Sequence, residues 1–164
     1  MASDDFRDVV KDRYGFETWE RPELTVSPPL YLPELTALDG FSHTERVPQS
    51  RSRHSFTDVL EGSDPEVRIG VTISQFDDAE QAQEALVTLL TYSMAPRLPR
   101  CEERGMRLGE VCFCGFDDPA TSVWFTRGNV LVQVENFGTH AIAVGAVAME
   151  LDRQVVTALG MLGA

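Results

Sequence analysis

The fold is decided by residues 122–137, which read SVWFTRGNVLVQVENF. Aliphatic and aromatic residues recur at every second position on both sides of a central Arg-Gly-Asn, which is typical of strands that bury one face. Gly128 and Asn129 both tolerate a positive φ, as tight hairpin turns require. We therefore predict a β-hairpin with strands at 121–127 and 130–137.

The same period of two appears earlier in the chain. Val67, Ile69, Val71 and Ile73 alternate with polar residues or glycine, which predicts a half-buried strand at 67–73. A shift of register by one residue would expose all four side chains to water, so the register is strongly specified. Three further strands are predicted at 41–47, 51–60 and 109–116.

Apolar residues at every third or fourth position predict three helices. Ser3 caps a short helix at 3–14, because its hydroxyl accepts from free amides of the first turn. Asp77 and Glu80 form a capping box for a helix that runs to about Met94, and a last helix covers about 140–159. The apolar side of the middle helix is expected to comprise Ala79, Ala82, Leu86, Leu89, Leu90 and Tyr92.

This order of elements predicts the α+β class. Strands that are adjacent in sequence favour antiparallel pairing, so we expect an antiparallel β-sheet of about six strands. Two main helices are expected to pack on one face, with a short N-terminal helix beside them. The 164 residues suit a single domain, 1–164. Residues 1–40 supply the N-terminal helix and a proline-rich segment that wraps the surface, and 41–160 form the core.

Composition and charge narrow the class of partner. The chain has 26 acidic and 14 basic residues and a net charge of −12. Such a chain repels phosphate backbones, so we expect no nucleic-acid binding. No run of 18 apolar residues occurs, so no membrane span is expected, and the first residues lack the pattern of a signal peptide. We predict a soluble cytoplasmic protein; the alternative is an exported protein whose leader has been removed.

Cysteine and histidine supply the candidate reactive groups. Cys101, Cys112 and Cys114 are an odd number of thiols, which fits a disulfide framework poorly, and we expect them to be reduced and buried. The alternatives are a disulfide from Cys101 to one of the others, a zinc site, or a nucleophile with a histidine as base. No cofactor is predicted. The three histidines are His43, His54 and His140.

Arginine clusters suggest an anion site. Guanidinium groups recognise carboxylates and phosphates through paired hydrogen bonds. One group surrounds His54 and the other lies in the loop after the middle helix, and a site would form if the two met in space. The candidate anion-binding residues are Arg51, Arg53, Arg97, Arg100, Arg104 and Arg107, with Arg46 nearby.

The C-terminal half resembles small uncharacterised bacterial domains. The resemblance lies in Leu108-Gly109-Glu110, in the hairpin at 122–134, and in a terminal helix that contains Leu151-Asp152. This order of elements is also similar to the Mog1/PsbP-like fold. The resemblance implies accessory or protein-interaction roles without catalysis.

The chain carries none of the glycine-rich, metal-binding or nucleophile motifs of common enzymes. We therefore predict a non-enzymatic protein-interaction or accessory module, bound to a protein partner or to copies of itself. Alternatives are a small-molecule or anion-binding domain with a pocket between sheet and helix, and an enzyme that uses a cysteine or histidine. The predicted interaction surface comprises Trp19, Tyr31, Val144 and Val147.

Overall fold

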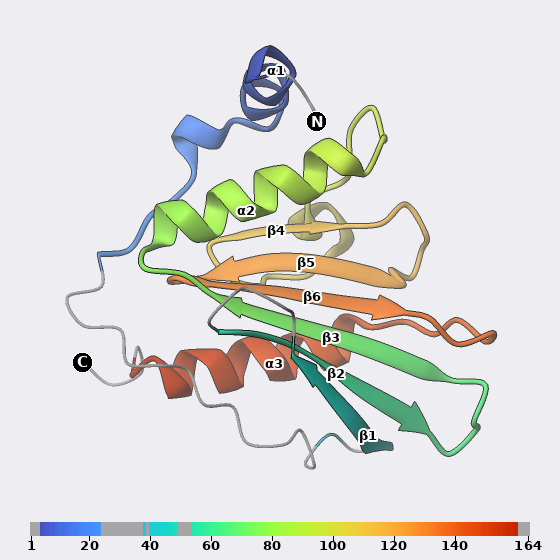
Figure 1. Ribbon diagram of the computed structural model, residues 1–164. Helices are drawn as coiled ribbons and strands as arrows, with labels where there is room; N and C mark the ends of the chain where they lie inside the picture. Colours follow the sequence, from blue (N-terminus) through green and yellow to red (C-terminus); the bar gives the residue numbers. More distant parts are fainter. Residues whose placement is uncertain (1–3, 24–37, 39, 49–53, 161–164) are drawn as a thin grey trace.

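The structure is a computed structural model that describes residues 4–23, 38, 40–48 and 54–160 (Figure 1). The helices are α1 (Asp4–Tyr14), α2 (Ala79–Tyr92) and α3 (Gly145–Ala158), with short 3-10 turns η1 (Phe16–Thr18) and η2 (Cys101–Arg104). The strands are β1 (Phe41–Pro48), β2 (Ser55–Gly62), β3 (Arg68–Gln75), β4 (Val111–Cys114), β5 (Ser122–Arg127) and β6 (Val130–Asn136).

The six strands form one antiparallel sheet in the order β1-β2-β3-β6-β5-β4. Two three-stranded meanders, β1–β3 and β4–β6, are joined where β6 pairs with β3. The predicted hairpin is confirmed: Arg127 pairs with Val130 at the turn, and Gly128 has a φ of 55°. The α+β class and the six-stranded antiparallel sheet are therefore as predicted.

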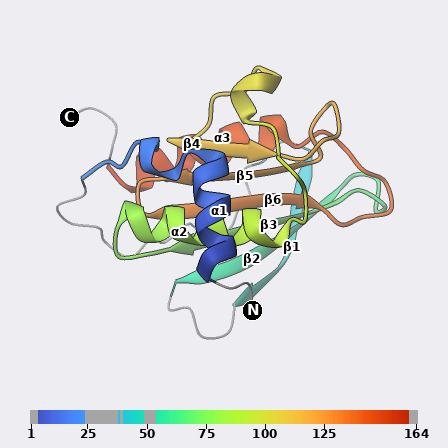
Figure 2. The ribbon, with the colours of Figure 1, turned by 90° about the horizontal axis from the view of Figure 1, so that it is seen from above.

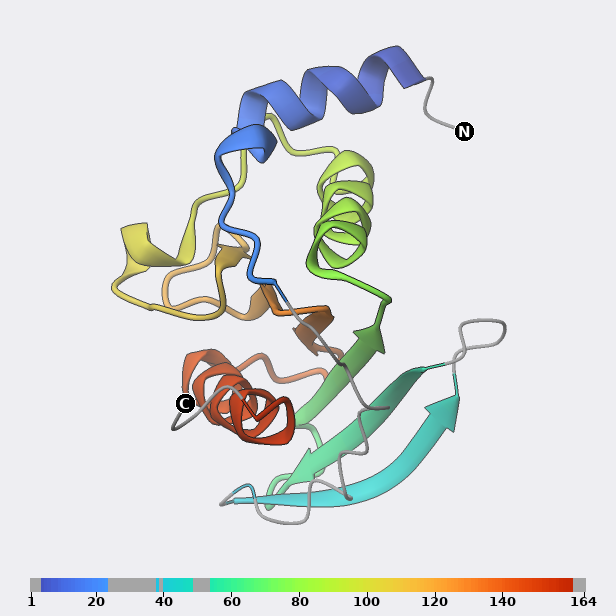
Figure 3. The ribbon, with the colours of Figure 1, turned by 90° about the vertical axis from the view of Figure 1, so that its left-hand side faces the viewer.

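Helices α2 and α3 pack on opposite faces of the sheet (Figure 2, Figure 3), whereas we predicted both on one face. Phe125 belongs to the buried cluster that contains Leu151 of α3. Phe113 and Leu131 belong to the second cluster, which contains Leu86 of α2. Strands β4 to β6 thus present apolar side chains to both faces, so each face requires its own cover.

Helix α1 lies across α2 as an outer layer (Figure 3). Arg7 and Lys11 both donate to the carboxylate of Glu84 on α2. Burial raises the pKa of Glu84, but the hydrogen bonds from Lys11 and Arg7 outweigh burial, so this pKa lies below its ordinary value. Tyr14, at the end of α1, sets its ring edge-on against Phe113, with the ring centroids 5.1 Å apart.

The N-cap of helix α2 lies one residue later than predicted. Asp78, not Asp77, is the N-cap: it has extended backbone angles, and its carboxylate accepts from the main-chain nitrogen of Gln81 at 2.8 Å. Asp77 lies before the cap, and its own main-chain nitrogen donates to the side chain of Gln81 at 3.4 Å. An aspartate cap is therefore present as predicted in kind, but the capping residues are Asp78 and Gln81 and not Asp77 and Glu80.

Helix α3 begins at Gly145 rather than near residue 140. The side chain of Asn136 explains the delay. Its Nδ2 donates to the carbonyl of Ile142 at 2.7 Å, and its Oδ1 accepts from the nitrogen of Ile142 at 3.1 Å. These bonds occupy the main chain that a longer helix would have used, so the preceding residues stay non-helical.

None of the helices in the described part of the chain has both the length and the apolar character needed to cross a membrane.

Candidate interaction surface at the end of helix α2

The chain turns sharply after α2. Ser93 caps the helix by donating its main-chain nitrogen to the carbonyl of Leu89. Met94 follows with a φ of 56° and a side chain that is 93% exposed. A left-handed conformation is disfavoured for methionine because Cβ crowds the following carbonyl oxygen. The turn therefore holds a large apolar side chain in solvent, at a cost in backbone energy.

A first pocket lies between α1 and the end of α2. Phe6 and Val10 of α1 line it, together with Leu90, Met94 and Pro96, around a cavity of about 370 Å³. Phe6 is 45% exposed although it lies on the apolar stripe of its helix. The first turn of α1 thus adds a second exposed apolar side chain beside Met94.

A second pocket lies between the end of α2 and the sheet, with a cavity of about 560 Å³. Three aromatic side chains line it: Tyr92 of α2, Phe116 from the loop after β4, and Trp124 of β5. Tyr92 is 65% and Phe116 59% exposed. Two carboxylates, Asp117 and Glu135, also line it, and its described lining includes no arginine, lysine or histidine.

The polar groups of this second pocket are held in place. The indole nitrogen of Trp124 donates to Oε1 of Glu135 at 2.7 Å. Asp117 accepts from the hydroxyl of Thr121 at 2.8 Å. Successive side chains of a strand point to opposite faces of the sheet. Val123 and Phe125, the neighbours of Trp124 in β5, face α3, and Trp124 therefore faces α2. Both carboxylates therefore stand at fixed positions around an aromatic lining.

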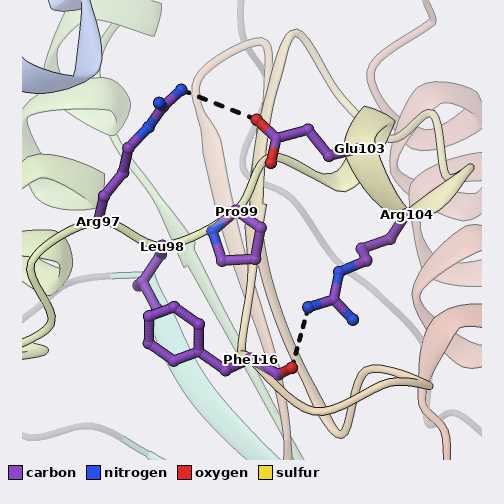
Figure 4. A pocket seen from close by; sticks show the side chains of 6 residues that line it. All are labelled: Arg97, Leu98, Pro99, Glu103, Arg104 and Phe116. Atoms are coloured by element: carbon purple, nitrogen blue, oxygen red, sulfur yellow. Dashed lines mark hydrogen bonds and ion pairs between the residues drawn. The ribbon is translucent and has the colours of Figure 1, made fainter.

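A third pocket contains two of the predicted arginines (Figure 4). Arg97 reaches Glu103 at 3.8 Å across the mouth of the pocket. Arg104 donates to the main-chain oxygen of Phe116 at 2.9 Å and to that of Asp117 at 3.1 Å. Both guanidinium groups are thus engaged by the protein, which weakens this pocket as an anion site.

The three pockets adjoin one another. Ala95 lines the first and the second, and Leu98 and Phe116 line the second and the third. We call the region the α2-end surface, and define it by its large partly or fully exposed side chains. These are Phe6, Tyr92, Met94, Phe116 and Trp124.

The other predicted anion-binding arginines lie apart from one another. Arg100 stacks on the ring of Phe113 at 5.4 Å, and Arg107 is exposed. Arg51 and Arg53 lie outside the described residues. Arg46 lies on β1, at the edge of the sheet opposite to β4, beside which the loop 97–107 runs. The described members of the two arginine groups therefore do not meet.

The predicted interaction residues are mostly interior, which corrects that prediction. Trp19 packs against Phe113 in the α2-side cluster. Val144, the N-cap of α3, and Val147, on α3 itself, are buried against the other face of the sheet. Tyr31 lies outside the described residues. The apolar excess around Val144 therefore reflects burial against the sheet.

Two of the three cysteines are oxidised, contrary to our first expectation and in agreement with the alternative. Cys101 and Cys112 form a disulfide with their Cα atoms 5.4 Å apart. Cys114 is a free, buried thiol, and burial raises its pKa, which disfavours the thiolate needed by a nucleophile. Among the described residues, no group of three histidine, cysteine or acidic side chains is placed to hold a metal ion.

Two of the histidines pair with carboxylates. Nε2 of His43 lies 2.8 Å from Oδ1 of Asp58. Asp58 is completely buried, and each of its carboxylate oxygens also accepts a hydrogen bond from Arg46. His140 lies 3.3 Å from Asp64 at the surface. Arg46 and His43, both on β1, thus compensate the buried charge of Asp58 on β2. The guanidinium of Arg46 also lies over the ring of Phe56, 4.1 Å from its centroid.

The α2-end surface was not found from the sequence. Tyr92 was assigned to the apolar side of its helix, and neither Phe116 nor Trp124 was singled out. The one available signal was Trp124, which stands out of phase with the aliphatic alternation of its strand. That signal indicated an aromatic side chain on the second face of the sheet.

Comparison with known proteins gave no relative: no family model, no curated protein and no solved structure matches this chain. The resemblance to the Mog1/PsbP-like fold therefore stays a prediction.

Proposed function

We propose that this chain is a protein-interaction module that binds a basic polypeptide through the α2-end surface. The observation that carries this proposal is Met94, a nearly fully exposed methionine in a left-handed turn, with Tyr92 and Phe116 exposed close by. Aromatic residues and methionine are enriched at protein interfaces, where each buries a large apolar area. Contiguous exposed side chains of this kind mark interaction sites.

Charge selects the kind of partner. The chain carries a net charge of −12, so a second copy is repelled and a basic partner is attracted during encounter. Asp117 and Glu135 bring negative charge into the α2-end surface itself. We therefore favour a basic partner over self-association.

The candidate reactive groups favour binding over catalysis. Burial raises the pKa of the free thiol of Cys114, and His43 is engaged with the buried Asp58. The resemblance to Mog1/PsbP-like domains points in the same direction.

The disulfide bears on where the partner is met. Disulfides persist in oxidising compartments, and Cys101–Cys112 therefore favours export over a cytoplasmic location. Binding assays should accordingly be run without reductant.

The test is site-specific photo-crosslinking in cells of the source organism. A benzophenone amino acid placed at Met94 is expected to give a discrete adduct with one protein. Mass spectrometry identifies that protein, and the purified pair is then titrated by calorimetry. Met94→Glu should weaken the measured binding at least tenfold, because it places a charge at the centre of an apolar contact.

Met149 provides the matched control, because it is an exposed methionine on α3, on the other side of the sheet. The crosslinker at position 149 should give no such adduct, and Met149→Glu should leave the affinity unchanged. Equal crosslinking from both positions, or an adduct only with a second copy of the chain, would overturn the proposal.

A further inference from the structure

The geometry points to a binding site for a cationic side chain, a guanidinium or an ammonium of the partner, in the pocket between Tyr92, Phe116 and Trp124. This inference deepens the proposed function and rests on it for the source of the cation. The pocket is the second one described above, and its lining comes from the end of α2, the loop after β4, the first half of β5 and the end of β6.

The aromatic lining supplies the first part of the recognition. Ring faces carry negative electrostatic potential, and cations placed over tryptophan or tyrosine are attracted to them. Trp124, Tyr92 and Phe116 come from three separate segments of the chain and line a single cavity. An arginine or lysine side chain that entered would also bury its aliphatic stem against these rings.

The carboxylates supply the second part. Oε1 of Glu135 accepts from the indole nitrogen of Trp124 at 2.7 Å. Among the described residues no side chain or main-chain amide donates to Oε2 of Glu135, and this residue is exposed, so Oε2 is available to a ligand. Asp117 adds a second negative charge at the same cavity. A guanidinium can donate to a carboxylate while it stacks on a ring, which combines both interactions.

The neighbouring pocket makes the assignment specific. There, Arg97 and Arg104 stand beside Glu103, so positive charge is already provided by the protein. In the aromatic pocket the described lining carries only negative charge. Anions are therefore disfavoured in the aromatic pocket, and a cation is the ligand class that both the charge and the rings select.

The test uses the two tryptophan indole N–H signals of the whole protein by nitrogen-15 NMR. Trp124 lies in the pocket, whereas Trp19 is buried and donates to the carbonyl of Tyr14. Titration with N-acetyl-arginine amide is expected to shift the Trp124 signal saturably and to leave the Trp19 signal in place. Sodium chloride at the same ionic strength serves as the screening control.

Glu135→Gln is the decisive variant, because the glutamine oxygen can still accept from Trp124 while the charge is lost. We expect the affinity for N-acetyl-arginine amide to fall about fivefold, the effect of losing one exposed charge contact. Glu80→Gln, on the exposed face at the other end of α2, is the matched control and should bind as the unmodified chain does.

A second arm separates the two sources of a cation. Tetramethylammonium and a short arginine-containing peptide are titrated in parallel. Tighter binding of the peptide supports the inference that the pocket takes a cationic side chain of the partner. Tighter binding of tetramethylammonium overturns that inference in favour of a free organic cation. A Trp124 signal that responds only as it does to sodium chloride overturns the cation site altogether. The proposed function would survive that result if crosslinking at Met94 still gave its adduct.

Discussion

Met94 shows how a single residue links backbone strain to a candidate function. Its φ of 56° places it where glycine is favoured, yet its side chain makes the surface apolar instead of contributing to the core. Left-handed backbone costs a non-glycine residue about 1–2 kcal/mol. Strain of this kind is retained at sites where the side chain serves binding rather than folding.

Met94→Gly is therefore expected to stabilise the fold while it weakens partner binding. Relief of the left-handed strain exceeds the extra chain entropy of glycine, which leaves a net gain of about 0.5 kcal/mol in the free energy of unfolding. Urea denaturation measures this gain. Ser93→Gly, at a right-handed position one residue earlier, should instead destabilise by about 0.5–1 kcal/mol. A loss of stability in Met94→Gly would contradict the interpretation of strain.

At the scale of elements, a buried ionic network ties α3 to the β5–β6 hairpin. Arg127 donates to both oxygens of Asp152 at 2.7 Å, and its third nitrogen lies 3.6 Å from Glu110. Gly109 donates its main-chain nitrogen to Asp152, and Gly128 donates to Glu110. One guanidinium thus joins the start of β4, the hairpin turn and the helix across the sheet.

Glu110→Gln is expected to remove a pH-dependent destabilisation. Burial raises the pKa of Glu110 above its ordinary value of 4.5, and Arg127 and the Gly128 amide offset this only in part. The folded state therefore holds this proton more tightly than the unfolded state, so stability falls as pH rises from 4.5 through the raised pKa.

The free energy of unfolding of Glu110→Gln, relative to the unmodified chain, should consequently increase between about pH 4 and about pH 7. Urea denaturation across that range measures the difference. Glu80→Gln, at an exposed position, provides the baseline. A difference that decreases with pH would show that the pairing with Arg127 outweighs the cost of burial.

At the scale of the molecule, two hydrophobic clusters share one sheet, and the disulfide reinforces one edge of it. The β-meander β1–β3 and the meander β4–β6 meet at β3 and β6, in the middle of the sheet. Cys101 of η2 and Cys112 of β4 close a loop of sequence separation 11 beside the edge strand. The loop that the disulfide closes leads directly from the α2-end surface into β4.

Removal of the disulfide is expected to destabilise the whole molecule by about 3 kcal/mol, the loop-closure entropy for a loop of this length. Denaturation of the Cys101→Ser/Cys112→Ser variant, or of the unmodified chain with reductant, measures this loss. Cys114→Ala is the control and should retain its response to reductant. An unchanged free energy of unfolding in protein whose Cys101 and Cys112 are shown to be reduced would contradict the prediction.

Local patterns in the sequence were sufficient for much of the fold. The alternation of apolar residues at 123–134, with Gly128 at the turn, correctly predicted the β5–β6 hairpin. The helical period at 79–90 correctly predicted α2. These features depend on neighbours in sequence, so they could be predicted. Helix ends were less accurate, because the side chain that delays α3 is Asn136, on the preceding strand.

What the sequence by itself determined was therefore the class of fold, the antiparallel strands and the approximate helices, since short-range periodicity decides which side of an element is buried. Only the tertiary structure decided that α2 and α3 cover opposite faces and that Cys101 meets Cys112. It also brought Tyr92, Phe116 and Trp124 to one cavity. Those outcomes depend on contacts between residues far apart in the chain, and a period of two or of 3.6 carries no information about which distant surfaces meet.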